Sequence, residues 1–515
     1  MTGAAGEGRG LSPVFPGLRR RDNSPVSRTD RIIPIEPAPP AADASGEVSL
    51  FEIRQKIYPR AVSGRFAQWR WAMIIGTQVI FYGGPWLVWN DRQAVLLDIA
   101  ARKFYIFGLV FWPQDVIYLT VLLILSALTL FLVTAIAGRV WCGFACPQTV
   151  YTELFLWIER RIEGDRPARM RLDRAPMSAE KIGKKAAKHG AWIALSLWTG
   201  ITFVGYFTPF RPLLAAIPGD LSGTEVFWML FYGFTTYGNA GWMREQVCKY
   251  MCPYARFQSV MFDRDTLVIT YDGARGEPRG PRSRKADVDA SGLGHCVDCS
   301  ICVQVCPTGI DIREGLQYEC IGCTACIDGC NQVMDKMGYP RGLIRYATQE
   351  ALAKGYGATA VLQRMFRVRT LVYVALLGGI TVAAAVSLAL KNPLKVDVIR
   401  DRGVLARETA PGIIENVYRL QIMNTDERPH QFTISATGLP GLEVVGVDAP
   451  VALAGATARL VPLRLQVGAD ADAAERAKPG GGRSVRTSER IEFTVQAADD
   501  PAIVRREQSS FLFPR

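Results

Sequence analysis

Histidine is scarce in this chain. Only three of its 515 residues are histidine, namely His189, His295 and His430, and all three lie outside the long apolar stretches. A membrane haem b needs axial ligands from the spanning helices, and histidine is the usual one. The sequence therefore provides no ligands for such a haem.

Charge is absent from five windows, each about as long as the 17–25 residues that a helix needs to cross a bilayer. They are Trp71–Trp89, Val116–Ala137, Ala191–Phe210, Val226–Met243 and Thr370–Leu390, and none contains Asp, Glu, Lys or Arg. A buried helix of a soluble protein could explain one such window but not five. We therefore expect a multi-domain membrane protein with an α-helical transmembrane bundle of five spans.

The formal net charge is +12, but the positions of the basic residues argue against nucleic acid as a partner. Residues 1–70 carry eleven Arg and Lys, and 139–190 carry eleven more, whereas 91–112 carries three. Arg and Lys collect in the cytoplasmic loops of membrane proteins. This pattern predicts a cytoplasmic N-terminus, cytoplasmic segments at 139–190 and 244–369, and a C-terminal part on the opposite side.

The first fifty residues lack the apolar core of a signal peptide and are rich in Pro, Gly, Ala, Ser and Arg. We expect 1–66 to be a disordered basic N-terminus. Cysteine is missing from the exported tail, because all twelve cysteines lie on the cytoplasmic side or at its membrane edge. A disulfide framework would show the reverse distribution, so the thiols are expected to bind metal.

The remaining chain divides into four predicted units. Four spans with the cytoplasmic loop 139–190 occupy 67–243, a cytoplasmic domain occupies 244–369, and a fifth span occupies 370–391. Beyond it, "VYRLQIMNT", "HQFTISATG", "ARLVPLRLQVG" and "RIEFTVQA" alternate polar and apolar residues. This alternation predicts short antiparallel strands and an immunoglobulin-like β-sandwich over 392–515.

Three shorter features carry expectations of their own. Phe104–Phe111, "FYIFGLVF", is apolar but too short to cross a bilayer, so we expect an interfacial or re-entrant segment. The stretch "TVYTELFLWIERRIEG" alternates at helical spacing and predicts a helix that lies on the membrane surface. His430 is expected at the surface of the sandwich.

The cysteine spacing makes the most specific prediction. Two C-x2-C-x2-C-x3-C runs lie fourteen residues apart. In such runs three cysteines bind one iron–sulfur cube and the fourth binds the other cluster. Zinc is the alternative for clustered cysteines, but eight in this doubled spacing favour two [4Fe–4S] clusters in a bacterial-type ferredoxin domain. The predicted ligand sets are Cys296, Cys299, Cys302 and Cys330 for one cluster, and Cys320, Cys323, Cys326 and Cys306 for the other.

Four further cysteines form two copies of C-x3-C-P at the ends of apolar windows. They are Cys142, Cys146, Cys248 and Cys252. Cysteines four apart lie on one face of a helix, and the proline after each pair should disrupt the helix there. Thiolates favour Cu(I), zinc or iron–sulfur clusters, and a dithiol/disulfide relay is a further alternative. Whether the four thiols form one site or two stays open.

Residues 50–390 closely resemble the cytochrome c oxidase accessory protein family of the CcoG/FixG/RdxA type. The resemblance rests on "CVDCSICVQVCPTGIDIREGLQYECIGCTACIDGC", "MDKMGYPRGLIRY", "KFYIFGLVFWPQD" and both C-x3-C-P repeats. The outer sandwich matches in placement and length, and 1–50 is not covered.

The resemblance implies a multi-pass protein of the bacterial inner membrane whose C-terminal domain is periplasmic. It implies a cupric reductase, which reduces Cu(II) to Cu(I) for the assembly of cbb3-type cytochrome c oxidase. Copper would then be bound by Cys142, Cys146, Cys248 and Cys252 as the catalytic residues. The implied partners are the lipid bilayer, copper ions, oxidase assembly factors or copper chaperones, and an electron donor that the sequence does not identify. Whether the chain forms a homodimer stays open.

Two alternative functions stay open. Membrane quinol dehydrogenases of the NapH type share four spans, both C-x3-C-P repeats and paired clusters, but lack the fifth span and the outer domain. This similarity allows a quinol-oxidising electron-transfer subunit. The other alternative is a non-enzymatic copper-binding scaffold whose sandwich binds an assembly partner.

Overall fold

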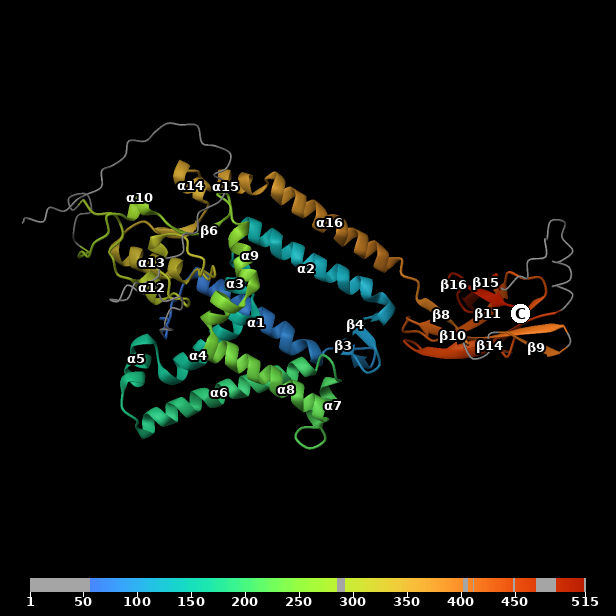
Figure 1. Cartoon of the computed structure of the whole chain (residues 1–515). Helices are drawn as coiled ribbons and strands as arrows, with labels where there is room; N and C mark the ends of the chain where they lie inside the picture. Colours follow the sequence, from blue (N-terminus) through green and yellow to red (C-terminus); the bar gives the residue numbers. More distant parts are fainter. Residues whose placement is uncertain are drawn as a thin grey trace, which may run out of the picture.

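The computed structural model describes residues 56–284, 292–401, 406–410, 412–447, 450–468 and 488–513. Most of the expected disordered N-terminus, residues 1–55, lies outside the described residues. Figure 1 shows a small cysteine-rich domain at one end, a bundle of helices beside it, and a β-sandwich at the opposite end. The sandwich is therefore far from the predicted cluster ligands.

Two helices, α2 (Val116–Ala137) and α16 (Val368–Ala389), run side by side between the two ends (Figure 1). Among the described helices, these two are long and apolar enough to cross a membrane. The hydroxyl groups of Tyr118 and Ser387 lie 3.0 Å apart across the pair. Since both helices leave many leucine and valine side chains exposed, an apolar surrounding would suit them better than water.

The other three apolar windows also form helices, but these are shorter or carry charge at one end. Two of these helices pack closely at Gly200, where a Cβ would come within 2.2 Å of the carbonyl oxygen of Met229 on the neighbouring helix. The five-span bundle stays a prediction, because only α2 and α16 combine the necessary length and composition. The helices concerned are α1 (Arg65–Gly83), α6 (Ala179–Val204), α8 (Gly223–Thr236) and the π-helix η3 (Tyr237–Met243), with η1 (Gly84–Trp86) and α7 (Phe210–Ala215) at their outer end.

The helix predicted from "TVYTELFLWIERRIEG" is present as α4 (Pro147–Glu163), but its carboxylates face protein instead of solvent. Glu153, Glu159 and Glu163 are 8%, 2% and 3% exposed. Glu159 lies 3.0 Å from Arg169 of α5 (Arg166–Arg174). Arg169 and the more distant Arg244 therefore neutralise Glu159 inside the protein, and a location of α4 on the membrane surface stays a prediction.

The segment predicted to be interfacial or re-entrant forms two strands of a small antiparallel sheet. Val110 is buried and its neighbours are more exposed, which is the period of a strand. The chain reverses at Phe107, whose φ of 50° lies in the left-handed region. The strands are β3 (Val95–Asp98), β4 (Lys103–Ile106) and β5 (Leu109–Phe111), and they lie between the pair β1 (Val88–Trp89) and β2 (Arg92–Gln93) and the turn η2 (Pro113–Asp115).

The cysteine-rich domain is closed by two antiparallel strands, β6 (Val268–Tyr271) and β7 (Ile344–Ala347). Four isoleucines, Ile269, Ile312, Ile327 and Ile344, form its apolar core together with cysteine side chains. The other elements are α10 (Gly273–Gly276), α12 (Ile301–Gln304), η5 (Ile312–Glu314) and α13 (Ala325–Met337), followed by α14 (Gln349–Lys354) and α15 (Ala358–Met365).

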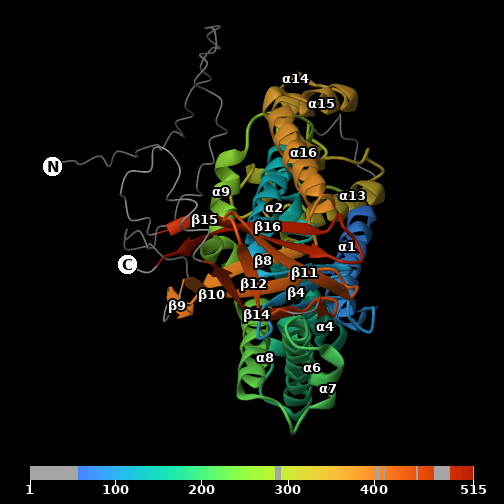
Figure 2. The ribbon, with the colours of Figure 1, turned by 90° about the vertical axis from the view of Figure 1, so that its right-hand side faces the viewer.

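The C-terminal part is a sandwich of two antiparallel sheets, as the alternating stretches predict. One sheet has the order β12-β14-β10-β8, with β9 also paired to β10, and the other has the order β13-β11-β15-β16. Figure 2 shows this domain from its outer end. Tyr418, Leu465 and Phe493 are fully buried between the sheets. The strands are β8 (Leu394–Arg400), β9 (Arg407–Ala410), β10 (Ile413–Asn424), β11 (His430–Thr437), β12 (Leu442–Val445), β13 (Val451–Leu453), β14 (Ala458–Val467), β15 (Ser488–Ala497) and β16 (Val504–Leu512).

The expectation that His430 lies at the surface is wrong, because the residue is 5% exposed. Its Nδ1 lies 2.6 Å from a carboxylate oxygen of Asp499, and its Nε2 lies 3.3 Å from one of Asp426. A polar ring can be buried when both nitrogens have partners. Asp426 lies close by in the sequence, whereas Asp499 is distant and is not recognisable from the local sequence around His430.

The sandwich contacts the outer sheet of the bundle. Lys391 lies between α16 and β8, and Lys395 lies in β8. Both lysines pair with the buried Asp115. Beside them Trp112 and Met423 pack together in a small apolar cluster. These contacts hold the sandwich against the end of α2.

Candidate functional site

The first predicted cluster set lines one hollow of the cysteine-rich domain. The lining includes Cys296, Cys299, Cys302 and Cys330. Asp298 and Ser300 have φ values of 50° and 53°, which few residues other than glycine adopt. This left-handed backbone curls the loop, so that cysteines three apart reach the same space.

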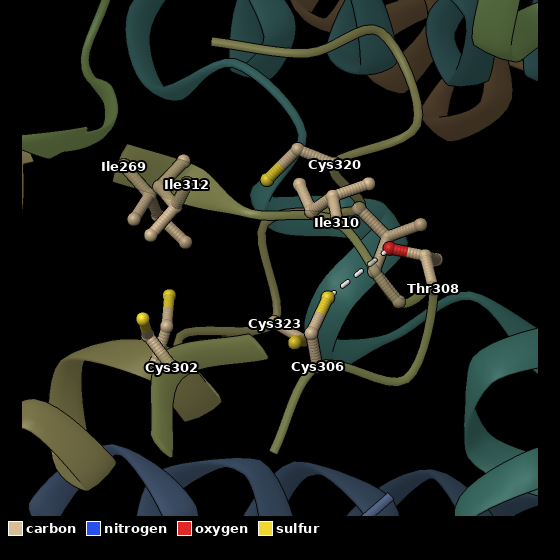
Figure 3. Close-up of a pocket in the computed structure, with 10 residues that line it drawn as sticks. Ile269, Cys302, Cys306, Thr308, Ile310, Ile312, Cys320 and Cys323 are labelled. Atoms are coloured by element: carbon tan, nitrogen blue, oxygen red, sulfur yellow. Dashed lines mark hydrogen bonds between the residues drawn. The ribbon is translucent and has the colours of Figure 1, made fainter. Parts of the chain in front are cut away.

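The second predicted set lines an adjacent hollow, shown in Figure 3. Its thiols are Cys306, Cys320, Cys323 and Cys326. The loop repeats the backbone of the first one, because Gly322 and Thr324 have φ values of 69° and 63° at equivalent positions. Cys302 lines both hollows, so the two sites are neighbours, and isoleucine side chains surround the second one.

The residues present fit two [4Fe–4S] clusters. Each hollow contains the three closely spaced cysteines of one run together with the distant fourth of the other, which is the crossed set expected for paired clusters. No three His, Cys, Asp or Glu side chains of the described residues converge on a single metal ion. This suits a cube of four irons, whose ligands stand farther apart than those of one ion. Ligation by these eight thiols stays a prediction.

Burial makes most of these thiols poor acids. It raises the pKa of Cys302 to about 11 and the pKa of Cys320 to about 12. A thiol must lose its proton to bind metal, so the cations of a cluster would have to offset the cost of a buried thiolate. Cys299 differs from the others, since it is the exposed member of the twelve cysteines. The first hollow is therefore the one with an exposed thiol, whereas the thiols of the second are buried or half-buried.

The two C-x3-C-P repeats have matching conformations, but the cysteines of each pair do not lie on one helix. Cys142 is in α3 (Val140–Phe144), and Cys146 is the extended residue that precedes α4. Cys248 is in the π-helix η4 (Val247–Met251), and Cys252 is the extended residue before α9 (Pro253–Met261). The prediction of a common helical face is wrong, because each proline is the first residue of a new helix. The expected break at the prolines is confirmed.

The four thiols of the repeats nevertheless lie near enough to influence one another electrostatically. Cys248 interacts electrostatically with each of the other three, and Cys142 interacts with Cys146 and Cys252. Burial, followed by these neighbouring sulfurs, raises the pKa of Cys142 to about 11 and of Cys248 to about 12. Whether they form one site or two stays open, because among the described residues no three His, Cys, Asp or Glu side chains are grouped closely enough to hold one metal ion. The Cys142 thiol also donates to Gln258 Oε1 at 3.2 Å.

This thiol group lies directly against the second cluster hollow. Cys142 and Cys248 pack against the buried cluster that includes Ile321 and Cys323. The carbonyl oxygens of Tyr318 and Cys320 accept hydrogen bonds from the guanidinium of the buried Arg139. The loop that carries three predicted ligands is thus held against the end of the bundle where the repeat thiols lie.

A cavity of about 30 Å³ lies between Cys248 and Cys323, with room for one or two waters. Cys248 and Cys323 both line it, together with the charged side chains of Arg70, Glu153, Arg244 and Glu245. These charged residues were not predicted from the sequence. They come from α1, α4 and the turn before η4, and no sequence motif indicates that they lie together.

Three family descriptions match the chain: a 4Fe-4S dicluster domain over 243–349, a 4Fe-4S binding domain over 119–164, and an IG-like fold at the C-terminus of FixG over 384–514. The chain is 41% identical to the nitrogen fixation protein FixG of Rhizobium meliloti, over 76% of this chain and 81% of FixG. It is 42% identical to protein RdxA of Cereibacter sphaeroides, over 78% of this chain and 88% of RdxA. A crystal structure of a FixG-related protein from Vibrio parahaemolyticus matches 24% of this chain and 97% of that one, at 18% identity and a TM-score of 0.19.

Proposed function

The chain belongs to the FixG/RdxA family of iron–sulfur oxidoreductases, and from that premise we propose that it reduces Cu(II) to Cu(I) at the four thiols of the C-x3-C-P repeats. Copper is the substrate, and each ion takes up one electron. The proposal includes a bacterial inner-membrane location with a cytoplasmic cysteine-rich domain and a periplasmic sandwich. It also includes delivery of Cu(I) for assembly of a cbb3-type oxidase, with assembly factors or copper chaperones as partners.

The observation that supports this proposal best is the contact between the two sites. Cys142 and Cys248 pack against the buried cluster that includes Ile321 and Cys323, so the thiol group lies beside the second predicted cluster. When bound, the clusters would supply single electrons. A soft-metal site in contact with a one-electron supply matches the reduction of Cu(II), which needs one electron and no bond cleavage.

The order of the sites favours electron uptake from a cytoplasmic donor. Cys299 is exposed and lines the first hollow, Cys302 lines both, and Cys323 lines the second and belongs to the buried cluster against which Cys142 and Cys248 pack. A donor would therefore dock near Cys299, at the solvent-facing end of the series. The nature of that donor is not part of the proposal.

The protein residues would make the thiol group selective for the reduced ion. Thiolates are soft ligands and prefer Cu(I). Burial raises the pKa of Cys146, although the backbone N–H groups of Gln148 and Thr149 oppose this effect, so a bound cation would have to stabilise the thiolate. Two thiolates suffice for Cu(I), so the absence of a three-residue ion site among the described residues is compatible with copper.

The proposal can be tested with anaerobically purified full-length protein. The protein is reduced with dithionite, freed of reductant by gel filtration, and mixed with Cu(II) in the presence of a chromogenic Cu(I) chelator. Wild type is compared with the variant in which all four repeat cysteines are serine. We expect about eight irons per chain in both, four for each cluster, and fast Cu(I) formation in wild type alone.

Equal Cu(I) formation by both proteins would contradict the proposal, because the repeat thiols would then be unnecessary. A different result is also informative. The first repeat lies within the 119–164 match to a 4Fe-4S binding domain. Iron above eight per chain that is lost in the serine variant would assign a third cluster to the thiols in place of copper.

A further inference from the structure

One buried arginine ties the loop of the second cluster hollow to both C-x3-C-P repeats. Arg139 is 6% exposed and lies just before α3, which carries the first repeat. Its Nη1 donates to the carbonyl oxygens of Tyr318 and Cys320, the latter at 3.4 Å, and its Nη2 donates to the carbonyl oxygen of Ala255. Ala255 belongs to α9, which directly follows the second repeat. A single side chain therefore joins three segments that are distant in the sequence.

Among the described residues, no carboxylate forms an ion pair with Arg139. Its Nε also has no hydrogen-bond partner. The groups on which its positive charge acts include thiols of both sites. The charge opposes the rise in pKa that burial causes in Cys142, Cys248 and Cys320. Arg139 therefore acts electrostatically on the repeats and on the second hollow at once.

Two other arginines beside the hollows do form ion pairs. Arg313 lines the first hollow and lies 2.5 and 2.6 Å from two carboxylates. Arg70 donates to the loop of the second hollow and lies 3.7 Å from Glu153. A carboxylate that close offsets much of the effect of a guanidinium on its neighbours. Arg139 differs from both, because no ion pair offsets its charge.

We propose that Arg139 is a positioning residue that joins the two redox sites: its hydrogen bonds hold the second cluster loop against both repeats, and its charge favours the electron on the second cluster. A reduced [4Fe–4S] cluster carries one more negative charge than the oxidised form. Net charge and hydrogen bonds around a cluster set its reduction potential. Since a buried charge is poorly screened, Arg139 should raise the potential of the second cluster.

This inference deepens the proposed function, and its consequence for copper rests on that function. Arg139 would favour an electron that enters near Cys299 on the cluster beside the repeat thiols. Cu(II) is the acceptor there, and the transfer moves one electron without breaking a bond. The effect of Arg139 on the potential does not itself require copper.

The test is a redox titration of the full chain without copper, in which the reduced clusters are followed by their paramagnetic signals. We expect Arg139→Gln to keep about eight irons and to make reduction of one cluster at least about tenfold less favourable, a shift of about 59 mV for one electron. Arg139→Lys retains the charge and should stay close to wild type. Arg256→Gln is the matched control, since it removes the same charge from an exposed position of α9, where water screens it.

Unchanged potentials in Arg139→Gln would overturn the inference. Equal shifts in the lysine and glutamine variants would also overturn it, because the charge would then be irrelevant. If the glutamine variant loses four irons, the lysine variant decides: two clusters with wild-type potentials support the inference, whereas loss of a cluster there too shows a purely structural role and contradicts it. A wild type that does not reduce Cu(II) would refute the proposed function, but the shift in potential would still stand.

Discussion

Gly143 of α3 lies so close to Gly322 of the second cluster loop that a Cβ on Gly143 would come within 2.6 Å of the Gly322 carbonyl oxygen. The same Cβ would lie 2.8 Å from the Cα of Cys323. Two backbones from distant parts of the chain therefore meet between Cys142 and a predicted cluster ligand. The approach depends on the missing side chain at Gly143.

Replacing this glycine should separate the two sites. Because the contacting atoms are backbone, Gly143→Ala must displace the loop, at a cost of about 1–3 kcal/mol. We expect a lower melting temperature, a weaker signal from one of the two reduced clusters, and slower Cu(I) formation. Gly190→Ala in α6 is the matched control, since a Cβ there meets nothing within 4 Å. Equal properties for the two variants would show that the close approach is unimportant.

The crossed assignment of the cluster ligands can be tested by pairs of substitutions. Cys296 and Cys330 line one hollow, and Cys306 lines the other. Removing two ligands of the same cluster should cost no more iron than removing one, so Cys296→Ser/Cys330→Ser should keep about four irons. Cys296→Ser/Cys306→Ser should lose both clusters. Iron, acid-labile sulfide and the spectrum of the reduced clusters are the readouts, and the reverse ranking of the two double variants would refute the crossed assignment.

Asp115 should control how firmly the sandwich is held. Lys391 and Lys395 both pair with this buried carboxylate. Asp115→Asn leaves two partly buried lysines without their counter-ion, and breaking a buried pair in this way costs about 3–5 kcal/mol. The contact between the sandwich and the end of α2 should weaken, and trypsin should cleave faster after Lys391 and Lys395. Glu443→Gln, at an exposed position of β12, serves as the control, and an unchanged cleavage rate for Asp115→Asn would contradict the prediction.

The contacts of Asp173, near the end of α5, should stabilise the protein less in acid. Partial burial raises the pKa of Asp173, but hydrogen bonds from Lys185, Lys56 and Tyr58 outweigh this effect and hold the pKa well below its usual range. A carboxyl whose pKa is depressed on folding stabilises the protein above its unfolded pKa, about 4 for Asp. That contribution is lost as the pH falls through the lower folded value.

The measurement for these contacts compares wild type with Asp173→Asn. The variant lacks the carboxylate at every pH, so its melting temperature should lie below that of wild type at pH 7. The gap should shrink as both proteins are acidified below pH 4, and loss of clusters in acid affects both equally. A gap that is constant over the pH range would show that the ionised form of Asp173 contributes nothing.

Much of the local structure could be predicted from the sequence, because it depends on neighbours along the chain. The cysteine spacing predicts two four-thiol sets, and the structure gathers the same two sets around adjacent hollows. The alternating residues around Tyr418 and Phe493 predict strands that face a sandwich core, and both residues are fully buried there. In each case the period or spacing encodes the geometry of the element itself.

Other features depended on partners that no local pattern announces. The helix breaks before Cys146 and Cys252 instead of after them, because each proline begins a new helix. His430 is buried because Asp426 and Asp499 satisfy its ring.

The sequence by itself determined which residues form helices, strands and cysteine sets, since these follow from backbone geometry and ligand spacing. The packing of Cys142 and Cys248 against the buried cluster that includes Ile321 and Cys323 could be found only in the tertiary structure. The physical reason is that burial and charge compensation depend on which segments pack together. Those contacts join residues that are distant in the sequence, such as Cys142 and Gln258, and no spacing along the chain records them.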